Sequence, residues 1–156
     1  MEHLIFDSGI REYQVNDNGV LRFNPSDPNL YTRFLDAVEQ IQAVERDLVA
    51  QAKKIEADKD QTESGAAVLR LMTGADRETK KILTEVFGAQ NDFDALLGGV
   101  NLLAVGGNGQ RVITNLLTAL QPVLVAGAET CAKQQVDMAV AKAQQSRAQR
   151  QAAAGQ

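Results

Sequence analysis

The chain has 156 residues, enough for one domain that buries about two-thirds of its unfolded surface. Its net charge of −4 excludes a general nucleic-acid binder, because the chain has no overall positive field to attract phosphate. Its single cysteine, Cys131, excludes an intramolecular disulfide and a multi-cysteine metal cluster, and fits a reducing cytoplasm. The amino terminus lacks the bases of a signal peptide, and no run approaches the roughly 18 apolar residues of a membrane span. We therefore expect a soluble intracellular protein without membrane contact.

Residues 3–23 predict a small β-hairpin. Two β-prone runs, HLIFD (3–7) and REYQV (11–15), precede a turn signal, NDNG (16–19). After the turn, VLRF (20–23) is expected to form the antiparallel return strand. A hairpin this short is marginally stable by itself, so we expect it to pack on the rest of the domain.

Two of the three prolines of the chain, Pro25 and Pro28, lie at the junction after this hairpin. Pro25 biases Asn24 toward an extended conformation and so ends the strand. Asp27 is a good helix N-cap, and Pro28 fits the first helical position, where its missing N–H costs nothing. The pattern predicts a sharp corner from strand to helix.

A long helix is expected over residues 28–59. Its apolar residues recur every seven positions at Phe34, Ile41, Leu48 and Ile55, with a second line formed by Leu30, Ala37 and Val44. Such a seam packs against another helix. The pattern leaves two interpretations open, an intramolecular core or a coiled coil with a second copy.

The rest of the chain predicts further helices. Short helices are expected over residues 66–98, with a stop at Gly74, a cap at Asp76, an end at Gly88 and a new start at Asn91 or Asp92. Five of the twelve glycines lie in residues 98–110, which predicts a tight turn with positive φ. An amphipathic helix follows over 110–141, in which Pro122 predicts either a kink or a break.

Residues 142–156 are rich in alanine and glutamine and contain no acidic residue. Their helix propensity is high, but they have no apolar stripe that obliges them to pack. We expect a frayed helical tail, separate from a single domain over residues 1–141 and free to meet a partner.

No catalytic set is recognisable. The only histidine, His3, lies beside the terminus, and Cys131 has no second cysteine near it. The run Gly106-Gly107-Asn108-Gly109 lacks the lysine and the Ser/Thr of a phosphate-binding loop. We expect no catalytic residue, no cofactor and no metal site, and hence a protein that is not an enzyme.

Four strings carry a family resemblance: FNPSDPNLY (23–31), VFG (86–88), GGVN (98–101) and NLLTALQPV (115–123). Over about residues 15–125 the chain resembles the tail assembly chaperones of long-tailed, siphovirus-like phages and prophages. The resemblance implies a helical protein in the cytoplasm of the bacterial host, absent from the mature virion. It also implies that the partners are the tape measure protein and, in addition, the major tail protein.

Two apolar seams are the candidate partner-binding surfaces: Phe34, Ile41, Leu48 and Ile55 in the first, and Leu116, Leu117, Leu120 and Leu124 in the second. Either seam instead forms plain core if the two face each other, and self-association also stays open. The alternative function is a structural virion protein, either a tail subunit or a head–tail connector subunit.

Overall fold

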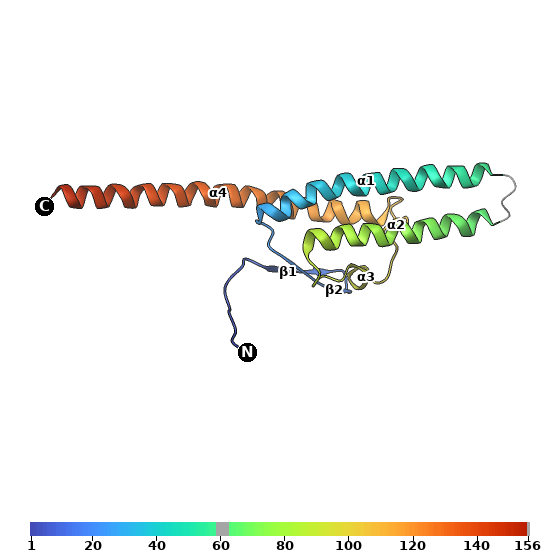
Figure 1. Ribbon diagram of the computed structural model, residues 1–156, viewed down its shortest axis with the longest axis horizontal. Coiled ribbons are helices and arrows are strands. Elements are labelled where there is room, and N and C mark those ends of the chain that lie inside the picture. Colours follow the sequence, from blue (N-terminus) through green and yellow to red (C-terminus); the bar gives the residue numbers. More distant parts are fainter. Residues whose placement is uncertain (59–62, 156) are drawn as a thin grey trace.

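A computed structural model of the chain describes residues 1–58 and 63–155. In chain order the elements are β1 (Arg11–Val15), β2 (Gly19–Phe23), α1 (Pro28–Ala57), α2 (Ser64–Phe87), α3 (Phe93–Leu96) and α4 (Val112–Ala154). The expected class, mainly α with a small N-terminal hairpin, is confirmed. Figure 1 shows α1 and α2 as an antiparallel pair with the first half of α4 beside them, while β1, β2 and α3 cover one side.

The hairpin is shorter than predicted. β1 pairs antiparallel with β2, from Arg11 opposite Phe23 to Val15 opposite Gly19, but the predicted strand over residues 3–7 is wrong. A longer β1 would need a partner beyond Phe23, and there the chain turns into α1. Instead the side chain of Asn24 donates to the carbonyl of Ser8 at 3.0 Å, and residues 1–10 extend into solvent.

A buried asparagine takes the place of a third strand. The side chain of Asn91 accepts the N–H of Arg22 and donates to its carbonyl, both at 2.9 Å, at the outer edge of β2. It also donates to the carbonyl of Phe87 at the end of α2. Each polar atom of this amide therefore has a partner, and the bonds join the sheet to the helices.

Aromatic rings continue this joint. The ring of Phe23 stacks on Tyr13 with centroids 4.8 Å apart and meets Phe87 edge-on at 5.0 Å. Phe87 in turn lies 5.7 Å from Phe93. The short hairpin is thus held by the helices, as its length requires.

The predicted corner is confirmed. The carboxylate of Asp27 accepts the N–H of Asn29 at 2.9 Å, and Pro28 is the first residue of α1. The side chain of Asn24 accepts the N–H of Ser26 and supports the turn. α1 ends at Ala57, and its predicted end at residue 59 lies outside the described residues.

The predicted stop at Gly74 is wrong, because α2 continues through it as one helix from Ser64 to Phe87. One helical glycine costs about 1 kcal/mol, which the packing of four apolar residues of α2 offsets; these are Ile82, Leu83, Val86 and Phe87. Asp76 caps no helix. The predicted end at Gly88 and the start of α3 after Asp92 are confirmed.

The last helix is longer than predicted. α4 continues through Pro122 and past residue 141. Of the two alternatives at Pro122 the break is therefore wrong, and so is the predicted helix end at residue 141. Pro122 is exposed, so its ring faces solvent and the cost is confined to one missing backbone hydrogen bond. Residues 142–154 are helical, as expected, but they continue α4.

The core is one cluster that all three long helices share. α1 contributes Leu30, Phe34, Ala37, Ile41 and Leu48, and α4 contributes Ile113, Leu120 and Leu124. α4 then crosses the corner before α1, where a Cβ on Gly127 would overlap the carbonyl of Pro25. The close approach therefore requires glycine at residue 127, and beyond it α4 leaves the core (Figure 1).

We expect Gly127→Ala to lower the free energy of unfolding by about 1–3 kcal/mol, because the backbone of α4 must move away from Pro25. Gly74→Ala is the matched control. An added Cβ there meets nothing within 4 Å, so the gain in helix propensity should raise stability by about 0.5–1 kcal/mol. Urea unfolding followed by circular dichroism measures both. Equal stability of Gly127→Ala and the parent would contradict the close approach.

Candidate interaction surfaces

The residues that carry chemistry lie apart along the chain. His3 belongs to the exposed N-terminal segment, and Cys131 is half-buried on α4. Within residues 1–58 and 63–155, no three His, Cys, Asp or Glu side chains gather closely enough to hold a metal ion.

The glycine-rich loop before α4 is part of the core. Gly98, Gly99 and Gly109 adopt positive φ, as the tight turn requires. Between them Leu102 and Leu103 are fully buried, and the carbonyl of Leu102 accepts the N–H of Ile113 at 2.9 Å. The loop therefore fixes the start of α4, and backbone groups of Leu102, Ala104 and Gly106 are hydrogen-bonded within the chain.

One ionic cluster joins this loop to α2 and α3. The ammonium of Lys80 donates to Asp76 at 2.8 Å and to Asp94 at 2.7 Å, and Asp76 also accepts the N–H of Leu102 at 2.7 Å. Burial by itself would lower the pKa of Lys80, but its hydrogen bonds to the two carboxylates outweigh this effect. The pKa of Lys80 is therefore raised above its ordinary value of 10.5. The position of the cluster indicates a structural joint.

The predicted seams lie mainly in the core. Phe34, Ile41 and Leu48 are buried, and Ile55, near the end of α1, is half-buried. On α4, Leu120 and Leu124 are buried, whereas Leu116 and Leu117 are half-buried. This arrangement matches the intramolecular alternative. In this conformation the fully buried members present no surface to a partner.

An apolar groove lies beside the seam, between α1 and α4. It encloses about 670 Å³. From α1 it is lined by Tyr31, Leu35 and Val38, and from α4 by Leu117 and Val125. Leu35 is 51% exposed and so offers apolar surface in this groove. We call this the α1–α4 groove; an amphipathic helix is the ligand that such a surface fits.

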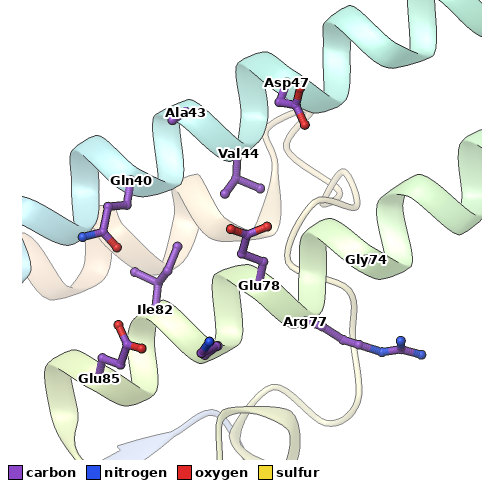
Figure 2. A pocket seen from close by; sticks show the side chains of 10 residues that line it. Gln40, Ala43, Val44, Asp47, Gly74, Arg77, Glu78, Ile82 and Glu85 are labelled. Atoms are coloured by element: carbon purple, nitrogen blue, oxygen red, sulfur yellow. The ribbon is translucent and has the colours of Figure 1, made fainter.

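A second groove lies between α1 and α2 and encloses about 800 Å³. Figure 2 shows Glu78 of α2 pointing toward Val44 of α1, whereas Arg77 points away. Its lining includes charges of both signs, from Asp47, Glu78, Glu85, Arg77 and Lys81. The mixed charges offer scattered ionic contacts and little continuous apolar area, so the α1–α4 groove is the better docking surface.

The two ends of the chain present further unpartnered surface. In the N-terminal segment Leu4 and Ile5 are each 94% exposed and Phe6 is 78% exposed. At the other end residues 132–145 of α4 are all exposed, including Val136, Met138 and Val140. Apolar side chains at these positions are typical of surfaces that a partner covers.

By length and composition alone, α4 is apolar enough to cross a membrane, contrary to the expectation that no segment approaches this limit. One such helix is weak evidence for a membrane span, because core helices of globular proteins pass the same test. In α4, however, only 22% of the apolar window is buried, and Ile113, Leu120 and Leu124 are its buried apolar residues.

No protein-family model, curated protein or solved structure matches the chain.

Sequence reasoning missed the α1 side of the groove. Tyr31, Leu35 and Val38 follow one another at helical spacing on a face next to the buried seam. Farther along the same face the polar residues Gln42 and Glu45 interrupt the apolar pattern, which makes this face hard to recognise in the sequence. A count of apolar residues on each face of α1, rather than only on its strongest face, would have found it.

We expect Lys80→Met to lower the free energy of unfolding by about 2 kcal/mol near neutral pH, because it removes two charge-assisted hydrogen bonds. Lys81→Met, at the exposed neighbouring position, is the control and should leave stability nearly unchanged. Since the pKa of Lys80 is higher in the folded state, its contribution is fully present below pH 10.5 and declines as the pH rises through the folded-state value. Urea unfolding of the three proteins from pH 7 to 11 measures this. A difference between the parent and Lys80→Met that stays constant across the whole range would contradict the assignment.

Proposed function

We propose that the protein is a phage tail assembly chaperone that binds a helical client and catalyses no reaction. The observation that carries the proposal is the α1–α4 groove, an open and mainly apolar groove between two helices, which is the kind of surface that takes an amphipathic helix. The motif resemblance supplies the client, the tape measure protein, with the major tail protein as a second partner.

In this role the groove covers the apolar stripe of a client helix that would otherwise aggregate. Leu35 and Val38 contact the stripe from α1, and Val125 contacts it from α4. Glu39 and Glu45 line the same groove and meet polar or basic residues beside the stripe. The chaperone acts in the cytoplasm of the host and leaves before the virion is complete.

A structural virion protein is the second candidate. The observation that favours it is the N-terminal segment, with Leu4, Ile5 and Phe6 almost fully exposed. Extended apolar arms suit subunits that join by reaching onto their neighbours. Mass spectrometry of purified particles separates the two candidates. A chaperone is missing from the particle, whereas a tail or connector subunit is abundant there.

Co-expression with the tape measure protein encoded nearby tests the proposal. We expect the parent to keep that protein in the soluble fraction and to co-purify with it, and Leu35→Asp to reduce the co-purified amount severalfold, because it puts a charge in the apolar groove.

Leu69→Asp is the matched control, since Leu69 is 65% exposed on α2 and lies outside the groove lining. It should co-purify the client like the parent. Unchanged solubility and fractionation of the tape measure protein with and without the parent would overturn the proposal.

A further inference from the structure

The second half of α4 is a helix without a partner in its own chain. Residues 132–145 are all exposed, with Val136 at 62% and Val140 at 50%. Figure 1 shows this half extending past the α1–α2 pair into solvent. A lone helix of this length gains little stability from propensity, so packing on another surface would stabilise it.

The face of α4 that lines the groove continues into the exposed half. Thr114, Thr118, Gln121 and Val125 follow at intervals of four, three and four residues. Ala132, Val136, Ala139 and Ala143 repeat these intervals on the same helical face. When two copies of α4 are placed antiparallel, each residue of one set can therefore lie opposite one residue of the other set.

The charges of the two surfaces also favour contact between the second half of α4 and the α1–α4 groove. Glu39 and Glu45 of α1 line the groove. From residue 139 onward α4 carries three basic residues, Lys142, Arg147 and Arg150, and no acidic one. The docked segment, residues 132–143, carries two basic residues, Lys133 and Lys142, and one acidic residue, Asp137. Its small excess of positive charge is complementary to the two glutamates of the groove.

We propose that two copies of the chain form an antiparallel dimer in which the second half of each α4 lies in the α1–α4 groove of the other copy. Ala132 then lies opposite Val125 of the second copy, and Val136 lies opposite Gln121. Ala143 lies opposite Thr114. The two contacts are identical by two-fold symmetry, so the association closes at two copies.

The direction follows from the fold. α4 runs antiparallel to α1 in Figure 1, so an incoming antiparallel helix runs along α1 and brings its basic end toward Glu45. A parallel pairing of the exposed halves would leave both grooves empty. The incoming helix then packs as a third helix beside α1 and the first half of α4.

Light scattering after size-exclusion chromatography, over a dilution series, tests the dimer. The parent should have twice the 16.9 kDa mass of a single chain. Ala143→Asp puts a charge in the interface and should shift the mass to that of one chain at the same loading.

Ala141→Asp is the matched control: the same change two residues away, also exposed, on the opposite face of α4. It should remain a dimer. Circular dichroism checks that both variants stay helical.

Engineered cysteines test the direction. In a Cys131→Ser background, Gln121→Cys combined with Val136→Cys should give a disulfide between copies under mild oxidation. The two positions are about 22 Å apart within one straight helix, which excludes an internal bond. Val136→Cys alone should not crosslink, whereas a parallel pairing would bring the two copies of residue 136 together.

A single-chain mass for the parent throughout the series overturns the proposal. So does a dimer that Ala143→Asp leaves intact, or efficient crosslinking by Val136→Cys alone. These experiments use the protein without any client, so their failure leaves the proposed chaperone function to its own test. That a client helix must displace the tail of the second copy is a consequence that rests on the proposed function.

Discussion

The structure depends on α1, whose buried face packs against both α2 and the first half of α4. Phe34, Ile41 and Leu48 of α1 belong to a core to which both α2 and the first half of α4 contribute. Two helices cannot cover the whole circumference of a third, so part of α1 stays open beside the seam. Leu35 and Val38 lie on that part, and they form the α1 wall of the apolar groove. Core and docking surface are thus adjacent faces of the same helix.

The crossing at Gly127 divides α4 into two parts with different roles. Before it, the helix packs in the core, and beyond it residues 132–145 are all exposed. At the crossing itself, the corner at Pro25 approaches the backbone of α4 too closely for any side chain at residue 127. The division gives one helix both a groove-lining segment and a segment that resembles a groove ligand. Under the proposed function, self-association and client binding would use the same surface. We infer that they compete for it.

Much of this fold follows from local chemistry that a sequence displays. Asp27 and Pro28 determine the start of α1, Asp92 caps α3, and the seven-residue repeat identifies the seam. What depends on distant contacts was not predictable. α2 continues through Gly74 because packing outweighs propensity, and residues 3–7 form no strand because a strand needs a partner. The groove is not predictable from the sequence, because polar residues interrupt its α1 face and its other wall comes from α4, far along the chain.

The central claim is that the seam of α1 is the core of each chain, whereas the second half of α4 is ordered by association. Hydrogen exchange of backbone amides at several protein concentrations tests it most directly. The account predicts that protection of residues 132–145 rises with concentration, while protection around Ile41 is high and constant. Protection around Ile41 that also rises with concentration would contradict it, since the seam would then lie between chains. Protection of residues 132–145 that does not change with concentration would contradict it as well.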